Sequence, residues 1–437
     1  MSNSVYFLGV DVAPHELGLV LVEPGGAVAA SMQRAYAGQV KDQSHDPQDW
    51  WRAVRTGIKE LLRRCKHGSH EIRAVGITGP SDAAVLLDRA GKVLCPSIVG
   101  ARDDLSPFVE ELVAAVGGRN LANLTGGITF TGCAATKLLW VRANERRVWH
   151  DLATVLSPRD FIRFRLTGTR ITDPSTAAAS RLFNPRNRIW SKQLLGQLQF
   201  APEWFPAVHH GSHISGRVSE AAARETGLAA GIPVVTGASD RISAALAAGA
   251  CTAGATVVEL GGAGSVLTVT GAARRDPGQR LACGCHCLDN LWTAEAEGLA
   301  DGPALDWFLA QVAPAEVQQA RRNRKEPLEL LAEIAASTPP GADGLFFLPP
   351  GPEGPGAFAG LTLRHTRSHL LRAALESGVF AVASLRPQIQ AVEPAGGPIA
   401  VIGPGATCGL WCQMMADALG HEVACHRDPL IAARGAA

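Results

Sequence analysis

The sequence predicts an α/β protein with two domains. The chain has 437 residues, which is longer than one hydrophobic core usually serves, so two domains, or three, are expected. Strand-like segments alternate with a helix-like one in the order 5–12, 17–24, 46–66, 71–79 and 83–88, and this alternation is typical of α/β folds. Apolar residues make up 46% of the chain and charged residues 19%, as in a globular protein with a large core.

The first segments predict a strand pair followed by a helix. Segments 5–12 and 17–24 are joined by a tight loop, and the acid Asp11 stands where the first segment enters that loop. Segment 46–66 is amphipathic, with apolar side chains near helical spacing and Asp49 near its amino-terminal end. The residues of this apolar face are Trp50, Val54, Ile58, Leu61 and Leu62. Packing in a core explains this face fully.

A second strand–turn–strand pattern, ATVVELGGAGSVLTVTG, occupies residues 255–271 and resembles residues 5–26. Two such hairpins, each opening one half of the chain, suggest a duplicated fold that holds a nucleotide between two hairpin loops. The seam is expected near residues 234–250. We therefore predict domains at 1–250 and 251–437, with a long Pro- and Gly-rich loop at 339–356 in the second half.

Charge and targeting signals indicate a small-molecule partner. The formal net charge of +1 provides no basic surplus for nucleic acid or an anionic membrane surface. The amino-terminal MSNSVYFLGVDVAP lacks the charged and long apolar stretches of a secretory signal, and the uncharged run 242–258 is short for a bilayer span. The ten cysteines are expected to be reduced thiols, so we expect a cytoplasmic protein.

Two stretches raise the possibility of a metal site. Cys283, Cys285 and Cys287 alternate, which places them on one face of a strand, whereas zinc sites usually have two residues between their cysteines. HHGSHIS at 209–215 contains three histidines without an acid or cysteine at a recognisable spacing. We expect no metal at either stretch.

Six stretches in order along the chain resemble the FGGY family of carbohydrate kinases, most of all its xylulose kinase branch. They lie at residues 74–99, 136–145, 155–168, 231–250, 360–382 and 401–420. One Gly-rich turn would be weak evidence, but six ordered stretches are specific. The resemblance implies an actin-like (ribonuclease H-like) fold of two domains that closes on ATP, Mg²⁺ and a sugar. The activity implied is transfer of the γ-phosphoryl group of ATP to a sugar hydroxyl.

The resemblance also implies roles for two acids. Asp240, in GASDRISAALAAGA, stands where the family has the general base that accepts the proton of the sugar hydroxyl. The alternative is that Asp240 only caps the helix that begins at Arg241. Asp11 stands where the family has the acid that orients Mg²⁺ and the triphosphate; the alternative is a turn acid that closes the first hairpin.

Two glycine-rich turns are assigned to the nucleotide. Gly261, Gly262, Gly264 and Ser265 form the second phosphate loop, and the alternative is a plain hairpin turn. The turn at Gly403, Gly405 and Ala406 precedes a helix, as adenosine-binding turns do, although such turns also occur without a nucleotide.

The first phosphate loop departs from the family pattern. Ala13, Pro14 and His15 replace a glycine and two hydroxyl residues, and proline removes an N–H donor. Two lost contacts of roughly 1.5–3 kcal/mol each would slow transfer by about 10² to 10⁴, and a protonated His15 would compensate in part. The second loop has Gly262 and Ala263 where the family has hydroxyl residues, and it keeps its backbone donors.

The sugar side is altered too. Ser81 and Asp82 replace a bulkier pair, and Gly100 and Arg102 replace an aromatic and an acid. Asp103, or its neighbour Asp104, is a candidate for holding sugar hydroxyls, while the alternative places both acids in the turn before a helix capped by Ser106. A different ketose or polyol is therefore expected as substrate.

Two functions are open at this stage. The first is a working ATP-dependent sugar kinase, and the second is a catalytically impaired homologue that binds a sugar or nucleotide and regulates a partner. Asp11 and Asp240 favour the first, whereas Pro14 and Gly262 favour the second. Relatives suggest a homodimer, and the second domain is expected to be truncated at its carboxyl end relative to the family.

Overall fold

The computed structural model divides into two compact units. The first contains Met1–Ala247, Ala282–Thr293 and Leu430–Ala437, and the second contains Ala248–Leu281 and Ala294–Pro429. The structure describes residues 5–38, 43–65, 68–100, 102–127, 132–262, 264–299, 301–323, 326–350, 355–394 and 396–437.

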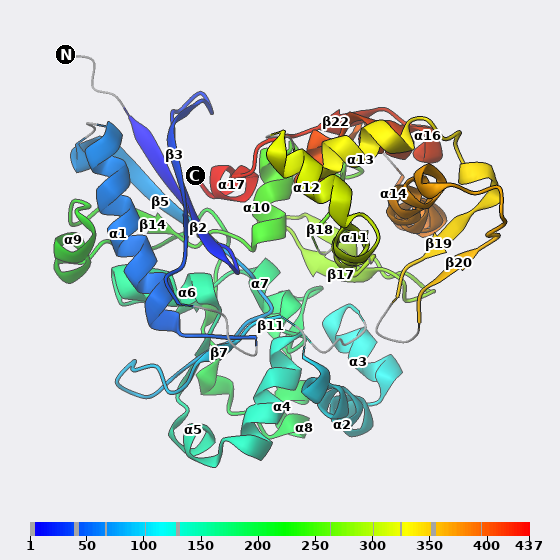
Figure 1. Ribbon diagram of the computed structural model, residues 1–437. Coiled ribbons are helices and arrows are strands. Elements are labelled where there is room, and N and C mark those ends of the chain that lie inside the picture. Colours follow the sequence, from blue (N-terminus) through cyan, green and yellow to red (C-terminus); the bar gives the residue numbers. More distant parts are fainter. Residues whose placement is uncertain are drawn as a thin grey trace. The chain divides into compact units, whose positions relative to one another are not determined.

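The first unit is built on a six-stranded sheet in the order β13-β14-β5-β1-β2-β3 (Figure 1). Its strands are β1 (Tyr6–Val12), β2 (Glu16–Val22), β3 (Val28–Ala35), β5 (Ile72–Thr78), β13 (Ile214–Arg217) and β14 (Pro233–Val235). β5 pairs in parallel with both β1 and β14, whereas β1 and β2 form an antiparallel hairpin. The carboxyl ends of β1, β5 and β14 therefore lie at one edge of the sheet, where ligands bind in open α/β sheets.

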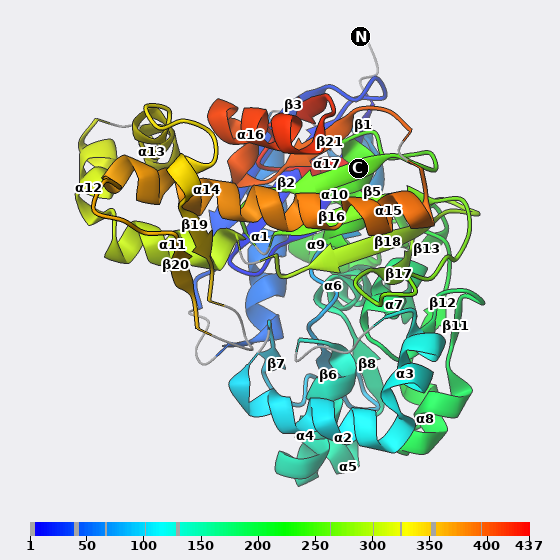
Figure 2. The same cartoon turned by 90° about the vertical axis from the view of Figure 1, so that its right-hand side faces the viewer.

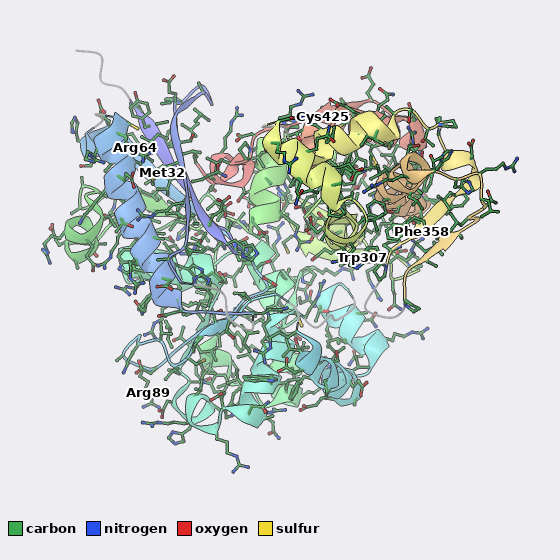
Figure 3. The ribbon with its side chains drawn as sticks, viewed as in Figure 1. Met32, Arg64, Arg89, Trp307, Phe358 and Cys425 are labelled. Atoms are coloured by element: carbon green, nitrogen blue, oxygen red, sulfur yellow. The ribbon has the colours of Figure 1, made fainter. Side chains whose placement is uncertain are left out.

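Helix α1 (Pro47–Cys65) covers one face of this sheet. Leu17 and Leu19 of β2 point toward it, and Gly57 lets the helix approach these side chains and Met32 of β3 (Figure 3). The predicted amphipathic helix at 46–66 is confirmed, since α1 buries the residues on which the prediction was based, with Leu62 partly buried.

Helix α17 (Ile431–Ala436) packs against β1, β5 and helix α10 (Asp240–Ala247). A Cβ atom at Gly9 would lie 2.0 Å from the carbonyl oxygen of Ala433, and one at Gly76 would lie 1.7 Å from that of Ala436. Only glycine allows so close an approach. The sheet thereby supports α17, and α17 supports the helix that begins with Asp240.

The rest of the first unit consists of helices and short strand pairs with a further apolar core. The helices are α2 (Ser106–Val116), α3 (Gly118–Thr125), α4 (Ala134–Asn144), α5 (Arg146–Asp151), α6 (Pro158–Thr167), α7 (Pro174–Ala179), α8 (Lys192–Leu198), α9 (Glu220–Thr226), η1 (Ser69–Glu71), η2 (Asp103–Leu105) and η3 (Pro202–Trp204). The pairs are β4 (Ser44–His45) with β7 (Ser97–Ile98), β6 (Val85–Leu87) with β8 (Thr154–Leu156), β9 (Ile171–Thr172) with β12 (Ala207–Val208), and β10 (Phe183–Asn184) with β11 (Ile189–Trp190).

The second six-stranded sheet has the order β17-β18-β16-β15-β21-β22. Its strands are β15 (Thr256–Glu259), β16 (Ser265–Thr270), β17 (Ala282–Cys285), β18 (Trp292–Glu297), β21 (Ile399–Ile402) and β22 (Val423–Cys425). β15 pairs antiparallel with β16 and parallel with β21, so the predicted hairpin at 255–271 is present.

Helices pack against one another around the core of the second unit, and α14 is its longest helix (Figure 2). They are α11 (Asp301–Gln311), α12 (Pro314–Arg322), α13 (Pro327–Ala335), α14 (Arg367–Ser384), α15 (Arg386–Val392), α16 (Gly409–Leu419), η4 (Ala342–Gly344) and η5 (Pro404–Thr407). Trp411 of α16 is buried and donates its indole N–H to the carbonyl oxygen of Leu375 on α14. Strand β19 (Phe346–Leu348) lies within the long loop predicted at 339–356, and it pairs with β20 (Ala357–Ala359) just after that range. That prediction is wrong in this part, because the aromatic side chains of Phe347 and Phe358 pack together.

Two expectations from the sequence concerned membrane-spanning segments and the state of the cysteines. No helix in the described part of the chain is both long and apolar enough to span a bilayer. The run 242–258 contains the end of α10 and the start of β15. None of the ten cysteines forms a disulfide.

Candidate active site

Asp11 lies at the carboxyl end of β1, opposite Gly18 on β2 and Thr78 on β5. Its Oδ1 atom is buried and has no hydrogen-bond partner among the described residues. An unpartnered buried carboxylate oxygen is costly unless the group is protonated or meets a cation. Either a proton or a positive ion would therefore supply a partner for this oxygen.

The electrostatics of Asp11 agree with this geometry. Burial, then the charge of Asp240, then that of Glu16 raise the pKa of Asp11 to about 7. The two aspartates therefore interact within the first unit, although 229 positions separate them in the sequence. Near neutral pH, Asp11 exchanges readily between its protonated and ionised forms.

Asp240 is the first residue of α10, just beyond the carboxyl end of β14. Its backbone N–H donates to the carbonyl oxygen of Gly79 at 3.1 Å, which ties the residue to the segment after β5. Its Oδ1 accepts from the N–H of Arg241 at 2.8 Å. This bond lies at the first turn of α10, and both the proposed catalytic role of Asp240 and its alternative role as a helix cap stay predictions.

The loop between β1 and β2 presents Pro14 and His15 as exposed residues. Tyr36, which sequence reasoning missed, donates its hydroxyl to the carbonyl oxygen of Ala13 at 2.9 Å. Burial, followed by the charges of Asp11 and Glu16, raises the pKa of Tyr36 far above its usual range. This tyrosine therefore remains a donor and holds the loop in place.

Ser81 and Asp82 follow β5 at the same edge of the sheet, with Ser81 buried and Asp82 half-buried. The buried ammonium of Lys137 donates to the backbone oxygen of Asp82 at 2.7 Å and lies 3.8 Å from its Oδ2. Burial lowers the pKa of Lys137, and the charge of Asp82 acts in the opposite direction. Sequence reasoning missed this contact, although Lys137 lies in one of the stretches that carry the resemblance.

A cavity of about 220 Å³ lies beside Lys137. Its wall includes Arg102, whose guanidinium stacks 4.7 Å from the ring centre of Trp140 and hydrogen-bonds to Asp104. Asp103 opens η2, and its side chain lies outside the described part of the chain. Ser106 is the first residue of α2, which has Leu105 as its N-cap, so Ser106 does not cap this helix.

Four buried charged residues lie behind this edge of the sheet, and none was singled out from the sequence. Arg159 pairs with Asp173 and with Asp160, and Arg163 pairs with Asp160. Although burial acts to raise it, the charges of the two arginines hold the pKa of Asp160 below its usual value. Two positive and two negative groups thus compensate each other away from water.

The second unit contains both predicted glycine turns. Gly261, Gly262 and Gly264 between β15 and β16 all have positive φ, and the N–H of Gly264 donates to the oxygen of Gly261. The side chain of Ser265 is buried and donates its hydroxyl to Glu259 at 3.0 Å. The polar groups that this turn offers to a ligand are thus mainly those of its backbone.

The other glycine turn lies directly beside this one. The N–H of Gly405 donates to the oxygen of Leu260 at 2.8 Å, and a Cβ atom at Gly261 would lie 3.6 Å from the nitrogen of Gly405. A Cβ atom at Gly405 would approach Leu260 to 2.5 Å. Gly403 has a φ of 84°, and Ala406 is fully buried. The structure therefore brings the two predicted nucleotide turns together within the second unit.

Within the described ranges no three His, Cys, Asp or Glu side chains are placed to hold a metal ion. Cys285 donates its thiol to the oxygen of Pro185, and the rings of His209 and His213 stack on each other.

The chain matches the models of a known protein family over most of its length. The model of the FGGY family of carbohydrate kinases, N-terminal domain, matches residues 6–247, and that of the C-terminal domain matches residues 262–437. The chain belongs to the FGGY family of carbohydrate kinases. The resemblance stated from the sequence and the predicted actin-like fold are confirmed.

Individual FGGY proteins agree over nearly the whole chain. The xylulose kinase of Escherichia coli strain K12 is 29% identical over 427 residues, covering 95% of this chain and 85% of that protein. A gluconokinase of Bacillus licheniformis is 24% identical and covers 96% of this chain and 83% of its own length. The crystal structure of xylulose kinase from Rhodospirillum rubrum has a TM-score of 0.87 at 31% identity, over 99% of this chain and 88% of that one. The chain is thus an ATP-dependent carbohydrate kinase of the FGGY family.

Proposed function

We propose that this FGGY kinase transfers the γ-phosphoryl group of ATP to a hydroxyl of a xylulose-like ketose or polyol, with Asp240 as general base. The observation that carries the proposal is that Asp11, near the carboxyl end of β1, and Asp240, whose N–H donates to the oxygen of Gly79 just after β5, both lie at the carboxyl edge of one sheet. A sugar hydroxyl is a weak nucleophile until its proton is accepted, and a positioned carboxylate typically accelerates such a step by about 10²- to 10⁴-fold.

The two aspartates suit different tasks. Asp240 is partly exposed and lies a few residues beyond the carboxyl end of β14, a position that suits a group that meets substrate. Asp11 is the residue that would hold Mg²⁺, because its buried Oδ1 lacks a hydrogen-bond partner among the described residues and an ion would supply one. When bound, the ion supplies positive charge for the phosphate oxygens. Asp11 must lose its proton for this, so we expect metal binding to weaken below pH 7.

The glycine turns of the second unit suit a nucleotide. In the proposal, the turn at Gly261, Gly262 and Gly264 contacts phosphates through its backbone, and the turn at Gly403, Gly405 and Ala406 contacts adenosine. Ser265 supports the turn through Glu259 and contributes its backbone only. His15, exposed next to Pro14, is a proposed phosphate contact of the first unit.

Ser81, Asp82 and Asp103 are the proposed sugar contacts. Lys137 fixes Asp82 through two of its atoms, so the carboxylate presents a defined acceptor to sugar hydroxyls. Xylulose kinases and gluconokinases both occur among the relatives, so neutral ketoses and sugar acids are the first acceptors to test.

A second candidate is favoured by one observation. Pro14 lacks an N–H at the tip of the first loop, so the chain would bind a sugar or nucleotide and transfer phosphate poorly, acting as a regulatory protein. A panel of ketoses, polyols and sugar acids, assayed by coupled ADP formation, distinguishes the two. Sugar-dependent ADP release with at least one acceptor supports the kinase. Measurable ATP binding with no release across the panel supports the binding protein.

A further inference from the structure

The segment that leads to Asp240 is fixed by side chains from distant parts of the first unit. It comprises residues 236–240, between β14 and α10. The oxygen of Thr236 accepts from Arg159 at 2.7 Å and from Arg163 at 2.6 Å. The oxygen of Ala238 accepts from the hydroxyl of Thr78 at 2.9 Å. The backbone of this short segment is thereby held in one conformation.

Asp173 organises these contacts from the start of α7. One carboxylate oxygen accepts from the N–H of Thr176 at 3.2 Å and binds the guanidinium of Arg159. The other accepts from both the N–H of Ser175, at 2.7 Å, and its hydroxyl, at 2.5 Å. Asp173 is fully buried, so all of these bonds form away from water. Charge-assisted hydrogen bonds in such surroundings are short and directional.

Ser175 connects this centre to Asp240. Its Oγ gives its hydrogen to Asp173 and accepts the backbone N–H of Ser239 at 3.0 Å. Ser239 is buried and directly precedes Asp240, and its oxygen accepts the N–H of Ser243 as α10 begins. Asp173 sets the direction of the Ser175 hydroxyl. The oxygen of that hydroxyl therefore faces the N–H of Ser239, the residue before Asp240, as its acceptor.

Stability alone does not require this arrangement. Buried ion pairs are often no better for stability than apolar groups of the same size, because removing charges from water is costly. What they supply is directional bonding, and the bonds from Arg159, Arg163, Thr78 and Ser175 end on backbone atoms of Thr236, Ala238 and Ser239, within four residues of Asp240. A displacement of about 1 Å at a reacting group can slow catalysis by about 10²-fold.

We propose that Asp173 and Ser175 are positioning residues that set the orientation of Asp240. This inference rests on the proposed function, in which Asp240 accepts the proton of the sugar hydroxyl. Neither residue touches substrate. Ser175 holds the backbone of Ser239, Asp173 holds Ser175 and Arg159, and Asp240 keeps the direction that proton transfer needs.

The test removes the hydroxyl of Ser175 and compares the effect with that of removing a similarly buried hydroxyl elsewhere in the first unit. Ser175→Ala removes the acceptor for the N–H of Ser239 and leaves the cap Asp173 in place. Ser215→Ala is the matched control, because Ser215 is equally buried and donates its hydroxyl to the oxygen of Val234 at 2.9 Å in the same sheet. For each protein the measurements are the melting temperature, amide hydrogen exchange over residues 236–243, and kcat and KM for ATP and for the best acceptor.

We expect Ser175→Ala to exchange faster over 236–243 and to lose about 10- to 100-fold in kcat, with both KM values nearly unchanged. Ser215→Ala is expected to show a similar change in melting temperature without the loss in kcat. Equal kcat in Ser175→Ala and the wild type, or equal losses in both variants, would overturn the proposal. Unchanged exchange over 236–243 would overturn it as well, and this arm needs no activity. If the wild type phosphorylates no acceptor, the proposed function fails, and the exchange data then decide separately whether Ser175 tethers this segment.

Discussion

The carboxylate of Asp240 raises the pKa of Asp11, and both residues lie at the carboxyl edge of the same sheet. Burial raises the pKa of Asp11 more than the charge of Asp240 does. The resulting pKa is about 7, so Asp11 is near its protonation midpoint at neutral pH. When two acids in one site lie in different environments, one can serve as the proton acceptor and the other as the cation ligand.

This relationship predicts a pH-dependent stability. The pKa of Asp11 rises from 3.8 in the unfolded chain to about 7 in the folded one, so its favourable contribution is complete below pH 3.8 and is lost as the pH rises through 7. We expect Asp11→Asn to be more stable than the wild type at pH 8 by about 2–4 kcal/mol, with the difference disappearing toward pH 4. Urea unfolding at several pH values measures this. Asp240→Asn should reduce the pH dependence, because the neighbouring charge is gone, and an unchanged profile would contradict the interaction.

The first phosphate loop predicts a gain of function. Pro14→Thr restores a backbone N–H and a hydroxyl at the exposed tip between β1 and β2. One recovered bond to a charged group, of roughly 1.5–3 kcal/mol, should raise kcat about 10- to 100-fold. Pro24→Thr, in the exposed turn after β2, is the matched control and should change nothing. No gain at position 14 would mean that the loop already binds phosphate in another way.

Lys137 predicts a selective effect on the sugar. Lys137→Met keeps the length of the side chain and removes the ammonium that holds Asp82. We expect KM for the acceptor to rise about 10- to 100-fold, with KM for ATP unchanged. Lys59→Met on the exposed side of α1 serves as control. Equal changes in both KM values would indicate general damage instead of a sugar-side role.

The close packing of helix α17 on β5 predicts that position 76 tolerates no side chain larger than that of glycine. Gly76→Ala places a methyl group 1.7 Å from the oxygen of Ala436, so α17 must shift from β5. We expect a loss of about 1–3 kcal/mol in the free energy of unfolding. Gly196→Ala on α8 has open space around its new methyl group and should be neutral or slightly stabilising. A Gly76→Ala variant as stable as the wild type would show that α17 is not packed as described.

The sequence predicted what depends on local pattern. The spacing of Trp50, Val54 and Ile58 was enough for α1, and the strand–turn–strand pattern at 255–271 was enough for β15 and β16. The family stretch at 231–250 contains Asp240, and the resemblance assigned Asp11 near the end of the first strand.

What the sequence did not predict depends on contacts between distant residues. Lys137 meets Asp82 across 55 positions, and Ser175 meets Ser239 across 64, so no local spacing reveals either bond. The raised pKa of Asp11 comes from burial, which a sequence does not state. The return of α17 to the first sheet was also missed, although Gly9 and Gly76 mark the place where it fits.

Asp240→Asn tests the central claim most directly. The substitution keeps the size of the side chain and removes its ability to accept a proton, so sugar-dependent ADP formation should fall by about 10²- to 10⁴-fold while ATP binding is retained. Asp417→Asn on α16 is the control, since Asp417 is exposed and its carboxylate accepts from the side chain of Gln413 on the same helix. Turnover equal to that of the wild type, with the acceptor that gives the most ADP, would remove Asp240 from the role of base.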